Sequence, residues 1–115
     1  MNQALNTDTR HLLSEGQITE AARLFGLLSE PVRLRLLRTL MESDMTVTEL
    51  VVSTGCKQAN VSKHLGILLS AGIVERTKEG TFSRYAMTDP FLKELCALIC
   101  GRMEHHASKK LHSLK

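Results

Sequence analysis

Apolar positions recur at helical spacing along most of this chain, and local signals mark where the helices begin. Residues 1–16 are polar and interrupted by Gly16, so we expect an N-terminal arm there. Thr19 is placed to cap a first helix that reaches about residue 28. The tripeptide Ser29-Glu30-Pro31 favours a second helix, because Ser can cap and Pro fits a first turn. The apolar arc of this second helix comprises Val32, Leu36, Leu37, Leu40 and Met41.

Two further helices are predicted on either side of a glycine turn. Thr46 and Glu49 match a capping box that opens a third helix, which Thr54-Gly55 ends. A fourth helix is predicted from about residue 57 to residue 70, with Val61, Leu65 and Leu68 toward the core. Its opposite side carries a row of small or polar residues, which are Ala59, Ser62, Lys63 and Gly66. A side without bulky apolar groups can lie close to another surface, and we expect base edges in a DNA major groove.

A β-hairpin and a long helix complete the pattern. Residues 73–77 and 81–87 are typical of two strands joined around Lys78-Glu79-Gly80. Asp89-Pro90 begins a last helix to about residue 110, with one apolar stripe made of Phe91, Leu92, Leu95, Leu98 and Ile99. A dimer interface would explain a long apolar helix beyond the core of one domain. We therefore predict a mainly α fold with a small β-hairpin, a winged helix-turn-helix over residues 17–110 that is homodimeric through its terminal helices, and a tail at 111–115.

Composition and charge narrow the class of protein. The 115 residues suit one domain, and 43% hydrophobic with 23% charged residues are ordinary values for a globular protein. No apolar run approaches the roughly 18 residues of a membrane helix, and the N-terminus shows no export signal, so we expect a cytoplasmic protein. The formal net charge is +3. Residues 54–88 carry five bases against two acids, as phosphate contact by the helix-turn-helix and hairpin would require. The last segment is also basic, so this signal supports DNA binding without deciding it.

Several side chains are candidates for contact with double-stranded DNA. Gln and Asn can pair with adenine, Ser can reach a base edge or phosphate, and Lys can bind guanine or phosphate. His64 lies nearer the core, and both packing and phosphate contact stay open for it. A solvated helix face and a mobile, charged turn are the alternatives for the rest. The candidates are Lys57, Gln58, Asn60, Ser62, Lys63 and His64 in the fourth helix, and Arg76, Lys78, Thr81 and Arg84 in the hairpin.

Three cysteines are the candidates for sensing chemistry, because a disulfide framework is unlikely for an odd count in a reducing compartment. Cys96 and Cys100 are four residues apart, so their thiols lie one above the other on a helix and could share a soft metal or metalloid ion such as As, Cd or Zn. A third ligand is usually wanted, and buried thiols at a dimer interface are the alternative. Cys56 begins the recognition helix, where sensing and packing both stay open. For His105, His106, His112 and Glu104, we favour a solvated tail over metal ligation.

Four segments together resemble the ArsR/SmtB family of bacterial repressors. They are Leu27–Leu37, Val47–Leu50, Gln58–Leu65 and Leu69–Val74, in the family's order and spacing. The resemblance implies a homodimeric winged-helix repressor on a palindromic operator, released by metal ions, metalloids or reactive sulfur and redox species. Two departures matter. The third helix lacks the Cys-x-Cys of many arsenic- and cadmium-responsive members, and Lys57 stands where the family often has a capping Ser.

Two other classes of function are alternatives to a repressor. A winged-helix module that binds a protein instead of DNA would have the same fold. A DNA-binding regulator without an inducer site would have the same DNA-contacting fourth helix. An enzyme is disfavoured, because the sequence shows no nucleophile–base–acid set, no phosphate-binding Gly loop and no closed zinc motif. The spacing of Cys96 and Cys100 also differs from the Cys-x-x-Cys of dithiol oxidoreductases.

Overall fold

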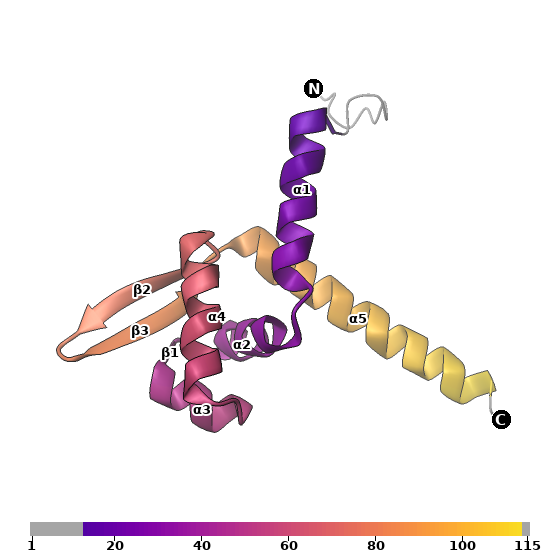
Figure 1. The fold of residues 1–115 in the computed structure, drawn as a ribbon. Helices are drawn as coiled ribbons and strands as arrows, with labels where there is room; N and C mark the ends of the chain where they lie inside the picture. Colours follow the sequence, from indigo (N-terminus) through magenta and orange to yellow (C-terminus); the bar gives the residue numbers. More distant parts are fainter. Residues whose placement is uncertain (1–12, 114–115) are drawn as a thin grey trace.

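The computed structural model describes residues 13–113, with side chains to residue 109, as five helices and a three-stranded sheet. The order is α1 (Glu15–Leu28), α2 (Pro31–Glu42), β1 (Met45–Thr46), α3 (Val47–Thr54), α4 (Gln58–Ser70), β2 (Val74–Glu79), β3 (Phe82–Met87) and α5 (Pro90–Ser113). The β2–β3 hairpin projects from one side of the body and the C-terminal half of α5 from another, while α1 stands away from both (Figure 1). The winged helix-turn-helix predicted from the sequence is confirmed.

The first two helices begin where their caps are, and two predicted caps were wrong. Ser14 caps α1 through a capping box with Gln17, so Glu15 and Gly16 belong to the helix and not to the arm. Thr19 lies inside α1 and donates its hydroxyl proton to the Glu15 carbonyl at 3.2 Å. Ser29 ends α1 by donating to the Gly26 carbonyl, and Glu30 caps α2. The predicted arm at residues 1–12 lies outside the described residues.

The helix-turn-helix is built from strong local signals. The capping box of Thr46 and Glu49 forms as predicted, with the Glu49 N–H donating to Thr46 Oγ1 at 3.2 Å and the Thr46 N–H to Glu49 Oε1 at 2.9 Å. Gly55 ends α3 with φ of 73°, a left-handed conformation that costs an L side chain about 1–2 kcal/mol. Lys57 precedes α4 without a side-chain capping bond.

The wing, which is the small sheet that contains the β2–β3 hairpin, has one more strand than the two that the sequence predicted. The sheet order is β1-β3-β2, and both pairings are antiparallel. Val74 pairs with Met87 and Glu79 with Phe82, so the turn is Gly80-Thr81 and Lys78 and Glu79 extend the strand. The short strand β1 pairs Met45 with Tyr85, which joins the wing to the start of α3.

The core lies between α2, α3, α4 and the base of the wing. Leu36, Leu37 and Leu40 of α2 are buried, as the predicted arc required. Val61, Leu65 and Leu68 of α4 are buried as well, which fixes the rotation of α4 about its own axis. The rest of the buried apolar set is Leu28, Leu50, Ile73, Val74, Met87 and Leu92.

The last helix departs from its predicted single stripe. The Asp89 carboxylate caps it, accepting from the N–H groups of Phe91 and Leu92 at 2.9 and 3.2 Å. Leu92 is 2% exposed, but Phe91 and Leu98 are 80% and 71% exposed, so they point away from the body of this chain. The helix continues to Ser113, into the predicted tail. No helix among the described residues is long and apolar enough to cross a membrane.

Candidate nucleic-acid interface

The row of small or polar residues on α4 is exposed, as the sequence predicted. Because Val61, Leu65 and Leu68 are held in the core, the opposite side of the helix must face outward. The residues on that outer side are Ala59, Ser62, Lys63 and Gly66, and Lys57, Gln58 and Asn60 at the start of α4 are exposed beside them. The N-terminal half of α4 and the residue before it therefore present two amides, a hydroxyl and two ammonium groups, while Ala59 and Gly66 add little bulk to this surface.

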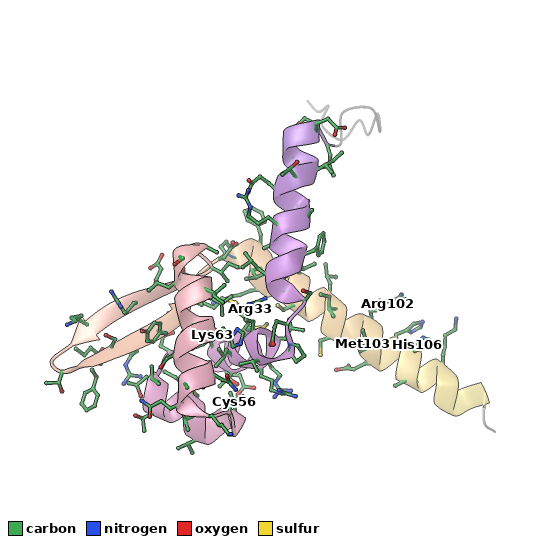
Figure 2. The ribbon with its side chains drawn as sticks, in the orientation of Figure 1. Arg33, Cys56, Lys63, Arg102, Met103 and His106 are labelled. Atoms are coloured by element: carbon green, nitrogen blue, oxygen red, sulfur yellow. The ribbon has the colours of Figure 1, made fainter. Side chains whose placement is uncertain are left out.

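The inner side of α4 carries the one buried polar residue of the described part of the chain, His64, at 7% exposed. Its Nδ1 lies 3.4 Å from Nη1 of Arg33 in α2, and Arg33 Nε donates to the Leu27 carbonyl at 2.7 Å. Figure 2 shows Arg33 where α1, α2 and α4 meet. Of the two roles left open for His64, this burial supports packing and hydrogen bonding.

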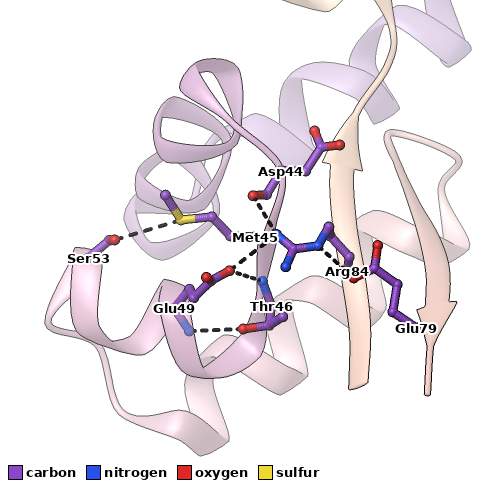
Figure 3. Close-up of polar contacts among 7 residues, drawn as sticks. All are labelled: Asp44, Met45, Thr46, Glu49, Ser53, Glu79 and Arg84. Carbon is purple, nitrogen blue, oxygen red and sulfur yellow. Dashed lines mark hydrogen bonds and ion pairs between the residues drawn. The ribbon is translucent and has the colours of Figure 1, made fainter. Parts of the chain in front are cut away.

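The wing candidates divide into two kinds. Arg76, Lys78 and Thr81 are exposed along β2 and its turn. Arg84 is instead tethered within the protein, because its Nε donates to Glu79 Oε1 at 3.1 Å and its Nη1 to the Asp44 carbonyl at 3.2 Å (Figure 3). Nη1 also lies 3.4 Å from Glu49 Oε1, and Glu49 is the residue of the α3 capping box.

The electrostatics of Arg84 follow from these carboxylates. The hydrogen bond that Arg84 donates to Glu79 and the negative charge of Glu79 raise the pKa of Arg84, with smaller contributions in the same direction from Glu49 and Asp44. One guanidinium thus links the tip of β2, strand β3 and the N-terminus of α3. Sequence reasoning missed this link and the contact between Arg33 and His64. Both join residues at least 31 positions apart, so no local pattern could reveal them.

The three cysteines lie in two places. Cys96 and Cys100 line one groove of about 630 Å³ between α2 and α5, so the two thiols share a face as their spacing predicted. Cys96 is half-buried, and burial raises the pKa of its thiol. Cys100 is exposed and its Sγ donates to Glu104 Oε1 at 3.6 Å. Among the side chains described, no three of His, Cys, Asp and Glu gather closely enough to hold a metal ion.

Cys56 stands apart from that pair. It precedes α4, packs against the core and donates its N–H to Thr54 Oγ1 at 3.2 Å. Figure 2 places it at the base of the helix-turn-helix, well away from Arg102, Met103 and His106 of α5. His105, His106 and Glu104 are exposed on α5, whereas the side chain of His112 lies outside the described set.

Comparison with known proteins decides the family. Residues 30–76 match the family model described as bacterial regulatory protein, arsR family. An HTH-type transcriptional regulator of Methanocaldococcus jannaschii is 37% identical over 81 residues, which cover 70% of this chain and 91% of that protein. This chain belongs to the arsR family. It is a transcriptional regulator and not an enzyme.

Further relatives place this arsR-family chain among repressors. A probable mercury resistance operon repressor of Streptomyces lividans is 36% identical over 77 residues, which cover 67% of this chain and 62% of that protein. The crystal structure of the AntR antimony-specific transcriptional repressor superposes with a TM-score of 0.81 and 28% identity, over 90% of this chain and 94% of that one. The homodimeric winged helix-turn-helix domain Mb0332 of Mycobacterium bovis gives a TM-score of 0.74 at 25% identity, over 86% and 94%.

Proposed function

We propose that this arsR-family chain is a homodimeric repressor that binds a palindromic operator through α4 and the wing, and that a thiol-reactive inducer at Cys96 and Cys100 releases it. The DNA-binding part of this proposal rests on the exposed outer side of α4, which is polar and cationic and has no bulky apolar side chain. A side of this kind fits a major groove, where amide and ammonium groups meet the acceptors and donors of base edges.

The contacts divide by chemistry. Gln58 and Asn60 are exposed in the first turn of α4, where the N-terminal residues of a recognition helix meet bases. Ser62 and Lys63 extend this surface, and Lys57 is placed for phosphate. In the wing, Arg76, Lys78 and Thr81 supply contacts to phosphates or the minor groove, while Arg84 orients the hairpin that carries them. His64 supports α4 from behind through Arg33.

The dimer is proposed from exposed apolar side chains on the two terminal helices. Such groups carry a cost in water unless a partner covers them. The homodimeric Mycobacterium bovis domain, which shares the fold, supports the same assembly here. A two-fold dimer would present its two α4 helices about 34 Å apart, one turn of DNA. The exposed apolar residues outside the α2–α5 groove are Ile18 and Phe25 of α1, and Phe91, Leu98 and Met103 of α5.

The inducer site is proposed at the groove that holds both α5 thiols. Antimony and mercury appear in the names of two relatives, which supports soft, thiol-seeking chemistry for this chain as well. The groove connects to the DNA-binding surface through one helix: α2 forms one of its walls and also holds Arg33 against His64 of α4. An inducer that binds one arrangement of α2 and α5 more tightly would shift the dimer away from its DNA-binding state.

Operator binding by the purified dimer, with and without cadmium, arsenite, zinc and polysulfide, tests the proposal. The expected result is steep weakening by salt and release by at least one reagent, with release lost in Cys100→Ser. Leu98→Glu should give monomers that do not bind the operator, whereas Val52→Glu, equally exposed but on α3, should stay dimeric. Binding to a protein partner, together with a lack of salt-dependent affinity for DNA, would instead favour a protein-interaction module.

A further inference from the structure

The groove between α2 and α5 is far larger than a metal ion. Its volume of about 630 Å³ lies in the range of roughly 300–1,000 Å³ that small-molecule sites occupy. Leu34 and Met41 of α2 and Ala97 and Ile99 of α5 give it apolar walls. Among the described side chains, its thiols and carboxylates do not gather in a group of three that could hold a metal ion. Both observations favour an organic ligand over an ion.

Two guanidiniums give the groove a polar end. Arg35 and Arg38 lie one turn apart on α2, line the groove and make no ion pair within the described side chains. Glu42 and Glu104 also line it, but Glu104 already accepts a hydrogen bond from Cys100. A carboxylate on a ligand would therefore find its partners at the two arginines.

We infer that this groove binds an apolar organic electrophile bearing a carboxylate, such as an unsaturated keto acid, and that Cys100 adds covalently to it. The inference rests on the proposed thiol-sensing role and names the class of inducer. Cys100 is the nucleophile because it is exposed and its thiol is hydrogen-bonded to a carboxylate. Cys96 lies one turn away and is half-buried, and burial raises the pKa of its thiol, which disfavours the thiolate.

The addition needs no oxidant. Glu104 accepts the Cys100 proton, and the thiolate forms a bond to the carbon β to the ligand's carbonyl. The π electron pair of the alkene moves to the carbonyl oxygen as an enolate, while the ligand's carboxylate stays paired with Arg35 and Arg38. The enolate then takes the proton back from Glu104 at its α-carbon, so the product is a thioether that keeps the ligand's carboxylate, and every atom of both reactants is retained.

Intact-mass kinetics on the folded dimer test the inference. The probe is trans-β-benzoylacrylate, which has an apolar ring, an activated alkene and a carboxylate, and phenyl vinyl ketone is the neutral control. We expect one adduct per chain at Cys100, absent in Cys100→Ser and unchanged in Cys56→Ser. Arg38→Gln and Arg35→Gln should each slow the charged probe about tenfold, the effect of one charge-assisted hydrogen bond. The neutral probe should react at its original rate.

Several results would overturn the inference. They are modification of Cys56 before Cys100, equal slowing of both probes by the arginine substitutions, or an unreactive Cys100 because a second copy of the chain covers the groove. Operator release separates this inference from the proposed function. Release by cadmium or polysulfide but not by benzoylacrylate refutes the organic ligand alone. No release by any thiol reagent refutes thiol sensing, and an absence of operator binding refutes the repressor.

Discussion

Nη1 of Arg33 lies 3.4 Å from Nδ1 of His64, so a polar contact from α2 supports the buried side of α4, the helix proposed to contact DNA. The same guanidinium binds the Leu27 carbonyl at the end of α1 at 2.7 Å. Arg33, a residue of α2, therefore connects three helices. They are α1, which carries exposed apolar groups, α2, which forms one wall of the groove with Cys96 and Cys100, and α4, which faces the DNA in the proposed complex. A guanidinium can only donate, so Nδ1 of His64 is the acceptor in this contact.

Replacing Arg33 should loosen this junction. Arg33→Met keeps the apolar stem but leaves Nδ1 of the buried His64 and the Leu27 carbonyl without their donor. We expect the free energy of unfolding to fall by about 1–2 kcal/mol. Urea denaturation at one fixed protein concentration measures it. Arg35→Met, which removes an exposed guanidinium from the same helix, is the matched control, and an equal loss in both variants would contradict the assigned role.

The capping box of α3 gives a second prediction. Thr46→Ala removes the acceptor of the Glu49 N–H and should destabilise the fold by about 1 kcal/mol. Thr48→Ala, in the same turn but exposed and without a side-chain hydrogen bond among the described residues, should change stability by less than about 0.5 kcal/mol. Thermal or urea unfolding of the two variants decides between them. Equal destabilisation would show that the box does not hold the helix start.

The salt dependence of operator binding should distinguish wing residues that contact phosphate from Arg84, which is bound within the protein. Arg84 is bound by Glu79, Glu49 and the Asp44 carbonyl, so Arg84→Met should weaken operator binding by disordering the wing while leaving the salt slope nearly unchanged. Lys78→Met should lower the slope of log K against log salt by about 0.9, the value for one lost phosphate contact. A slope reduced as much by Arg84→Met as by Lys78→Met would assign Arg84 to phosphate.

The pKa of Cys96 predicts its alkylation profile. Burial disfavours the thiolate and raises the pKa of this thiol, so its reaction with iodoacetamide should rise at a higher pH in the folded protein than in urea. Peptide mass spectrometry after timed alkylation follows Cys96 alone. A folded-state profile that rises at the same or a lower pH than the profile in urea would rule out desolvation as the dominant effect.

Most of the fold could be predicted because its signals are local. A capping box at Thr46 and a glycine at position 55 with positive φ define α3, and the i, i+4, i+7 spacing of Val61, Leu65 and Leu68 sets the exposed side of α4. Local signals also misled. Gly16 resembled a helix breaker, yet it lies in the first turn after the Ser14 cap.

The remaining differences arise from contacts between distant parts of the chain. Strand β1 has only two residues and exists because Met45 and Thr46 pair with β3. Leu92 packs on the core while Met103, about three turns later on the same side of α5, is 60% exposed, because α5 leaves the body of the protein along its length (Figure 1). The tether of Arg84 and the support of His64 by Arg33 also join distant segments. Such contacts depend on tertiary structure, which periodicity along a sequence does not specify.

The most direct test of DNA binding through α4 introduces a bulky side chain on the outer side of this helix. Ala59 is exposed near the start of this helix, and Ser70 is exposed at its other end. Ala59→Phe should leave dimerisation and unfolding unchanged but weaken operator binding at least about tenfold, a loss of about 1.4 kcal/mol. Ser70→Phe should keep its affinity, because the N-terminal residues of a recognition helix meet the bases. Full operator affinity in Ala59→Phe would contradict the claim that this side of α4 enters the major groove.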